Sequence, residues 1–116
     1  MKKDWSTIRE RYLRDDLSVR LGGLAANLSR IKSFANNEKN KSLVESLIDE
    51  SKHFIEWTAQ ETEIETAAKL VELQVELALW QIKINLIWLD ADQRRQISER
   101  SNAWSQQVLM ASGLLN

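Results

Sequence analysis

The chain has 116 residues, a net charge of −1 at pH 7, no Cys, no Pro and three Gly. A chain of this length is expected to form one domain over residues 1–116 with a core of its own. The absence of Cys excludes disulfide bonds, thiolate metal sites and cysteine nucleophiles, while the near absence of helix breakers favours an all-α fold.

Charge is unevenly distributed along the chain. Residues 1–41 carry a net charge of +5, residues 42–76 carry −7, and the remainder carries +1. We interpret this asymmetry as charge complementarity between neighbouring helices of one bundle. A basic surface that binds an acidic partner is the alternative.

The sequence shows neither a secretory leader nor a membrane span. The first residues are basic, but no apolar segment follows them. The most apolar window, residues 77–89, is too short to cross a bilayer and contains Gln81, Lys83 and Asn85. We therefore expect a cytoplasmic protein.

Two helices are predicted in the N-terminal third. The first covers residues 4–14, with Asp4 as its N-cap. The second covers residues 16–35, and its apolar residues recur at helical spacing. Gly22 and Gly23 interrupt this helix, and we expect them to mark a close crossing with another helix that leaves no room for a side chain.

The middle of the chain predicts two further helices. Asn36 and Asn37 are expected to end the second helix, because Asn tolerates the left-handed conformation. A third helix covers residues 40–59 and could begin at Ser42, which has the spacing of a capping box. Thr62 has the same spacing and predicts a break before a fourth helix at 62–89. Because no Gly or Pro lies there, one continuous helix over 42–89 is the alternative.

A fifth helix is predicted over residues 91–112. Asp90 provides its N-cap and Gly113 closes it. All connections are short, which favours antiparallel neighbours. The predicted fold is an antiparallel up-and-down bundle of four long helices and a short N-terminal helix.

The fourth helix is apolar on two opposite faces. At about 100° per residue, the first stripe contains Ile64, Ala68, Val71, Val75, Ala78, Ile82 and Leu89. The second stripe contains Leu70, Leu73, Leu77, Trp80, Ile84 and Ile87, with Trp88 beside it. A helix with two apolar faces is central to a bundle or shared between subunits.

The bulky second stripe is the predicted subunit interface. It contains Trp, which is enriched at the centres of interfaces, whereas the small residues of the first stripe suit close packing within the chain. The predicted interface residues are Leu70, Leu73, Leu77, Trp80, Ile84, Ile87 and Trp88. The expected partner is a second copy of the chain, and an unidentified protein partner is also possible.

Residues that could carry chemistry are few. Glu50 and His53 have the Glu-x-x-His spacing of di-metal bundles, but such a centre needs a second pair and two more carboxylates. His53 is the single His, and we place it on the solvent side of its helix. Acidic pairs such as Glu72 and Glu76 lie off the apolar stripes, where a hydrated surface is expected.

We therefore expect a non-enzymatic protein without cofactor or metal, which acts through protein–protein association. Two other functions are alternatives. A nucleic-acid-associated regulator would use the basic N-terminal region, but its cations do not align on one face, so we expect no nucleic-acid binding. A ligand- or metal-binding bundle would use the interior.

Overall fold

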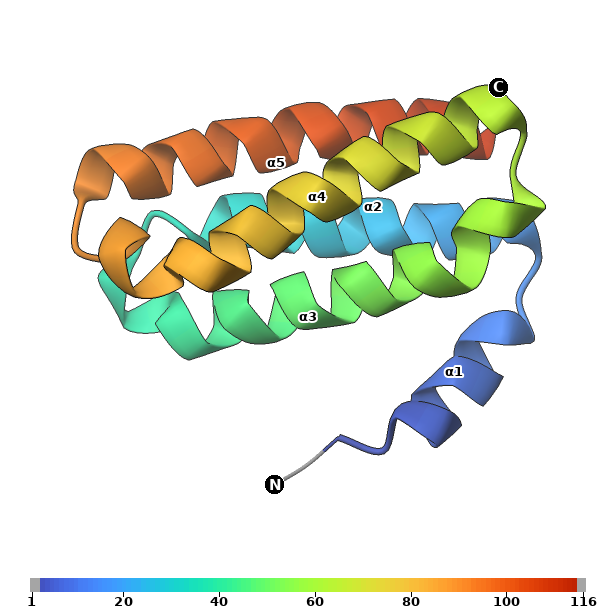
Figure 1. Cartoon of the computed structure of the whole chain (residues 1–116), viewed down its shortest axis with the longest axis horizontal. Helices are drawn as coiled ribbons and strands as arrows, with labels where there is room; N and C mark the ends of the chain where they lie inside the picture. The colour runs from blue at the N-terminus through green and yellow to red at the C-terminus, as the bar shows by residue number, and fades with distance from the viewer. Residues whose placement is uncertain (1–2, 115–116) are drawn as a thin grey trace.

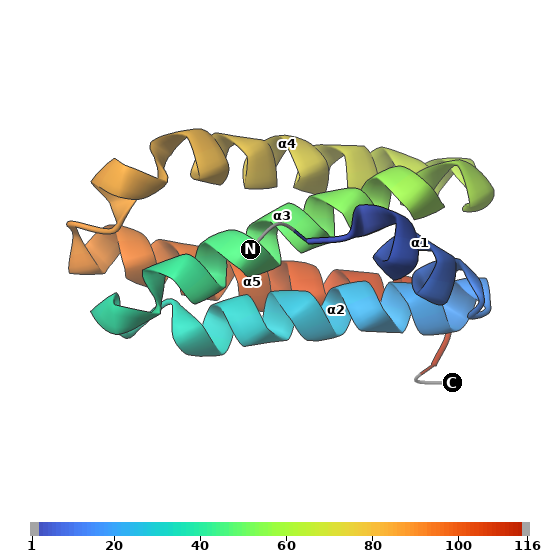
Figure 2. The same ribbon diagram turned by 90° about the horizontal axis from the view of Figure 1, so that it is seen from below.

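Five α-helices form an antiparallel bundle in the computed structural model, which describes residues 3–114 (Figure 1). The four long helices alternate in direction, and the short first helix lies outside them (Figures 1 and 2). The predicted all-α architecture is confirmed. The elements are α1 (Trp5–Leu13), α2 (Leu17–Phe34), η1 (Glu38–Asn40), α3 (Lys41–Thr58), η2 (Ala59–Glu61), α4 (Ile64–Ile87) and α5 (Ala91–Ser112).

Three predicted helix ends are confirmed in atomic detail. The Asp4 carboxylate accepts a hydrogen bond from the backbone N–H of Thr7 at 3.2 Å. The Asp90 carboxylate accepts one from the backbone N–H of Asp92 at 2.8 Å. Gly113 ends α5 with a φ of 77°, in the left-handed region that Gly adopts without strain.

The break between α3 and α4 is also confirmed, but its chemistry differs from the prediction. The N-cap of α4 is Glu63, and Thr62 instead donates its hydroxyl back to the carbonyl of Ala59 at 2.7 Å. At the other end of α3, the N-cap is Asn40 rather than Ser42. Both predicted capping boxes are therefore wrong, because these hydroxyls do not cap the helices that follow them.

The turn after α2 also differs from the prediction. No residue other than Gly has a positive φ within residues 3–114, so Asn36 and Asn37 do not close α2 in the left-handed conformation. Asn37 instead accepts the backbone N–H of Lys39 with its side chain at 2.9 Å and caps the short turn η1. This use of Asn is the local hydrogen bonding that favours Asn in turns.

The most extensive helix contact joins α2 and α5. Small residues on α5 face α2 there: Ser105 donates its hydroxyl to the carbonyl of Ala25 at 2.8 Å, and Ser98 donates to that of Lys32 at 2.8 Å. Small side chains permit close approach, and their hydroxyl groups satisfy carbonyl oxygens of the neighbouring helix. This pair of helices forms one side of the bundle.

The predicted close crossing at Gly22 and Gly23 is not what the structure shows. A Cβ on Gly23 would meet only the Tyr12 ring, at an ordinary contact distance of 3.8 Å. A Cβ on Gly22 would meet a methyl group of Leu114 at 2.7 Å, which is the end of a flexible side chain rather than a helix backbone. The two Gly residues therefore do not mark a helix–helix crossing.

Helix α1 packs against α3 through aromatic rings. The Tyr12 ring stacks on Phe54 with centroids 3.9 Å apart, and the Trp5 ring lies 6.2 Å from that of Trp57. The Tyr12 hydroxyl donates to the carbonyl of Arg20 at 2.8 Å, and burial raises the Tyr12 pKa to about 12. Helix α1 thus covers α3 and leaves the outer side of α4 uncovered (Figures 1 and 2).

Candidate association surface

The predicted interface residues lie in the core of the single chain. Leu73 and Leu77 are fully buried, and Trp80 is 9% exposed. The remaining members of the set, Leu70, Ile84, Ile87 and Trp88, are buried as well. A second copy could not reach this stripe without opening the bundle, so the structure moves the candidate surface to the opposite face of α4.

The opposite face of α4 is exposed along its whole length. Ile64 is 87% exposed, Ile82 is 78% exposed and Leu89 is 84% exposed. We define the exposed stripe as Ile64, Val71, Val75, Leu79, Ile82, Leu86 and Leu89. It includes most of the first stripe and adds Leu79 and Leu86, which flank it on the helix.

Helix α4 is an outer member of the bundle, which explains the exposure. It packs between α3 and α5, and its contact with α3 is the more extensive. Helix α1 does not cover its outer side, because α1 is packed on α3 (Figure 2). One apolar face of α4 therefore completes the core, and the other has no cover within the described residues.

One edge of the exposed stripe carries side-chain amides and faces α3, whose Lys side chains bind two of them. The amide oxygen of Gln81 accepts from Lys52 Nζ at 2.7 Å, and that of Asn85 accepts from Lys41 Nζ at 2.6 Å. Gln74 donates its amide to the carbonyl of Lys52 at 3.3 Å. We call Gln74, Gln81 and Asn85 the amide flank.

The other edge of the stripe is charged, and it faces α5. Glu76 accepts two hydrogen bonds from the Arg100 guanidinium, at 2.7 and 2.9 Å, and one from Trp104 Nε1 at 2.9 Å. The bonds from Arg100 lower the Glu76 pKa below its usual value of 4.5, and burial opposes this effect. The charged flank also contains the exposed residues Glu65, Glu72 and Lys83.

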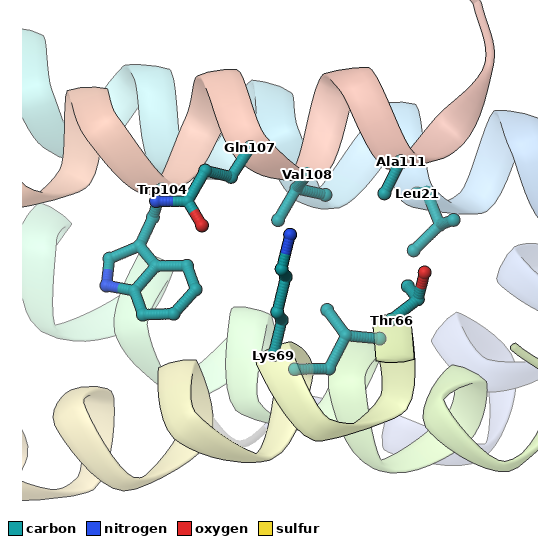
Figure 3. Close-up of a pocket in the computed structure, with 8 residues that line it drawn as sticks. Leu21, Thr66, Lys69, Trp104, Gln107, Val108 and Ala111 are labelled. Atoms are coloured by element: carbon teal, nitrogen blue, oxygen red, sulfur yellow. The ribbon is translucent and has the colours of Figure 1, made fainter. Parts of the chain in front are cut away.

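A small pocket lies between the first half of α4 and the second half of α5 (Figure 3). The side chain of Lys69 reaches across it from α4 towards Val108, beside the Trp104 indole (Figure 3). Its cavity volume is about 10 Å³, which is room for about one water molecule. A pocket of this size does not hold a substrate or cofactor.

An open groove of about 530 Å³ lies beside α1 and α2, with Phe54 and Gly23 in its lining. Its polar side chains bond to one another. Asn27 donates its amide to Glu50 at 3.0 Å, and Arg30 donates to the Asn27 oxygen at 3.0 Å. These groups stabilise the packing of α2 on α3.

Glu50 and His53 do not converge on a common site. Glu50 is directed to Asn27 of α2, whereas the His53 ring stacks on Trp5 with centroids 3.7 Å apart. His53 Nδ1 also lies 2.8 Å from the carbonyl oxygen of Asp49. His53 is half-buried under α1, and not fully solvated as predicted. Residues 3–114 contain no group of three or more His, Asp or Glu side chains arranged to hold a metal ion.

Two basic residues of the N-terminal region pair with carboxylates of the same chain. Arg20 is 6% exposed, and its guanidinium forms two hydrogen bonds with the Glu61 carboxylate at 2.8 and 3.0 Å. These bonds lower the Glu61 pKa. Lys3 lies 3.9 Å from Glu50 in a second pair of this kind. Sequence spacing gave no signal for the pairing of Arg20 and Glu61, which are 41 residues apart.

Comparison with known proteins gives no relative from which a function could be transferred. No protein-family model, no curated protein sequence and no solved structure matches this chain. Among the described residues, none of the helices has the length and apolarity needed to span a membrane. The exposed stripe and its two flanks are therefore the features of the molecule that point to a function.

Proposed function

We propose that this protein acts without catalysis, by associating with a second copy of itself through the exposed stripe of α4. The observation that carries the proposal is a row of seven large exposed aliphatic side chains, six on one face of α4 and Leu89 in the turn directly after it. From Ile64 to Leu89 the stripe is about 38 Å long at 1.5 Å per residue and, at roughly 10 Å wide, covers on the order of 400 Å². Exposed apolar patches of this size often mark interaction sites.

The free energy available from the stripe is of the size that dimerisation requires. Complete burial of one Ile, Leu or Val side chain is worth about 1.5–3 kcal/mol. Covering seven that are partly exposed offers on the order of 10 kcal/mol, which is comparable with the 4–15 kcal/mol cost of association. Polar contacts on the flanks then decide how tight the dimer is.

The surroundings of the stripe favour a protein surface over a lipid surface. The first half of α4 carries the exposed carboxylates Glu65 and Glu72 beside the stripe. Helices that bind anionic membranes carry Lys and Arg in these positions. A second copy offers a stripe of the same length and chemistry, which is the self-complementarity that a two-fold interface needs.

The test is the oligomeric state of the wild-type chain and of Ile82→Glu, measured by sedimentation. We expect the wild type at twice the chain mass of 13.5 kDa. Ile82→Glu is expected to sediment as a monomer while it keeps its helical circular dichroism, because residue 82 is 78% exposed in the chain itself. The charge would be buried only in the dimer, where it has no partner.

Met110→Glu is the matched control. Met110 is 73% exposed and lies on α5, so it presents a similar apolar side chain on another helix. This variant is expected to remain a dimer. A wild type that is monomeric at high micromolar concentration would contradict the proposal, as would an Ile82→Glu variant that remains dimeric.

A further inference from the structure

The direction in which two copies meet follows from the different chemistry of the two flanks of α4. The charged flank carries Glu72 and Lys83 beside the exposed stripe, both exposed. Within residues 3–114 neither of them forms an ion pair. The side chains of the amide flank are uncharged, but the ammonium groups of Lys52 and Lys41 from α3 are bound to Gln81 and Asn85. The two possible two-fold arrangements place these flanks differently.

In a parallel pair the two-fold axis runs along the helices, so the charged flank of one copy lies opposite the amide flank of the other. Lys83 of each copy would then lie level with Gln81 and Asn85 of the other, where the ammonium groups of Lys52 and Lys41 repel it. In an antiparallel pair the axis is perpendicular to the helices, so charged flank meets charged flank. Opposite charges can then pair between the copies, which favours this orientation.

The axial positions of the two charges also fit the antiparallel pair. Glu72 and Lys83 are separated by about 16 Å along the helix at 1.5 Å per residue. An axis that passes midway between them, next to Ala78, sets Glu72 of each copy level with Lys83 of the other. The midpoint of the stripe from Ile64 to Leu89 lies within one residue of the same level. The register that pairs the charges therefore also overlaps the two stripes along their full length.

We infer that the exposed stripe pairs antiparallel with that of a second copy, with Glu72 of each copy beside Lys83 of the other. This inference rests on the proposed dimer and specifies its geometry. The small side chain of Ala78 beside the axis permits the two helices to approach closely. On the same side of the axis, about 10 and 7 Å from it, Val71 of one copy and Ile82 of the other face each other with an offset of about 3 Å along the helices.

Disulfide cross-linking tests the orientation directly, because the chain has no Cys of its own. A disulfide needs Cα atoms about 4.4–6.8 Å apart. In the antiparallel dimer, Val71→Cys alone and Ile82→Cys alone should each give little cross-linked product, whereas an oxidised mixture of the two should give the mixed disulfide. Ser18→Cys, an exposed position on α2, serves as the control for random oxidation.

Charge reversal provides a second, independent measurement. Glu72→Lys and Lys83→Glu are each expected to raise the dimer Kd about 3- to 10-fold at low salt, since each reversal disturbs two symmetric pairs. The double variant should restore the wild-type Kd, because the charges again meet their opposites.

These experiments test the antiparallel orientation separately from the existence of the dimer. A dimer in which Val71→Cys cross-links efficiently with itself, or in which the double variant is as weak as the singles combined, would overturn the antiparallel inference and leave the dimer standing. A wild type that is monomeric at high micromolar concentration would overturn both.

Discussion

The two apolar faces of α4 have opposite environments, although they belong to one helix. One face carries Leu73, Leu77 and Trp80, which are at most 9% exposed. The other carries Val75 and Ile82, which are 57% and 78% exposed. The buried face is built from bulkier side chains, which fill the space between α3 and α5, whereas the exposed face is built largely from β-branched residues.

The helical periodicity of apolar residues therefore identifies the faces that a helix can bury. It does not identify which neighbouring helix or subunit covers each face. Both faces satisfy the helical repeat equally well. Which face enters the core depends on the width of the gap that the rest of the bundle leaves. The bulky face enters the core, where Leu73, Leu77 and Trp80 pack between α3 and α5.

A charge on the buried face of α4 is expected to have the largest effect. Trp80→Glu is expected to abolish cooperative unfolding, since losing a buried Trp costs about 3–5 kcal/mol and burying a carboxylate adds to that. Leu79→Glu, at the neighbouring exposed position, is the control and should keep the fold. Circular dichroism during thermal unfolding shows whether each of the two variants unfolds cooperatively. If Trp80→Glu instead dissociates a dimer and still melts cooperatively, Trp80 lies between subunits as the sequence predicted.

Truncation on the two faces gives a smaller effect and a direct contrast. Leu77→Ala should lower the free energy of unfolding by about 2–5 kcal/mol, because it leaves a cavity in the core. Ile82→Ala should change the stability of the monomer by less than about 0.5 kcal/mol, as is usual for surface positions. Denaturant unfolding at protein concentrations below the dimer Kd measures the free energy of unfolding of each variant. Equal losses at the two positions would show that both faces are buried within one chain.

The charged flank between the faces provides the smallest expected effect. Glu76→Gln should cost about 1 kcal/mol at neutral pH, since it weakens the bonds from Arg100 and Trp104. The Glu76 pKa is lower in the folded chain than its usual 4.5, so this stabilisation is present above pH 4.5 and is lost as the pH falls below it. Unfolding curves from pH 3 to pH 7 should therefore converge for the two proteins at the acidic end. A constant difference across this range would mean that the charge of Glu76 does not contribute.

Local signals in the sequence predict the helices and three of their ends. The absence of Pro and the helical spacing of Leu21, Leu24 and Leu28 predict what the structure shows. Asp4, Asp90 and Gly113 act where they were expected, because a cap depends on residues within one turn of it. The candidate metal pair and the capping boxes at Ser42 and Thr62 show that residue spacing alone does not predict the partner of a side chain. The same residue order leaves open whether a side chain bonds forwards, backwards or to another helix.

Only the tertiary structure decided which apolar face of α4 is free. The sequence predicts the short N-terminal helix, but not that its aromatic residues Trp5 and Tyr12 pack on α3 and leave α4 uncovered. Nor does it show that Arg20 would be buried against Glu61. Contacts of this kind join residues far apart in the chain and depend on the volumes and charges of several helices at once. The periodicity of one helix fixes its faces, but the packing of its neighbours decides which of them meets water.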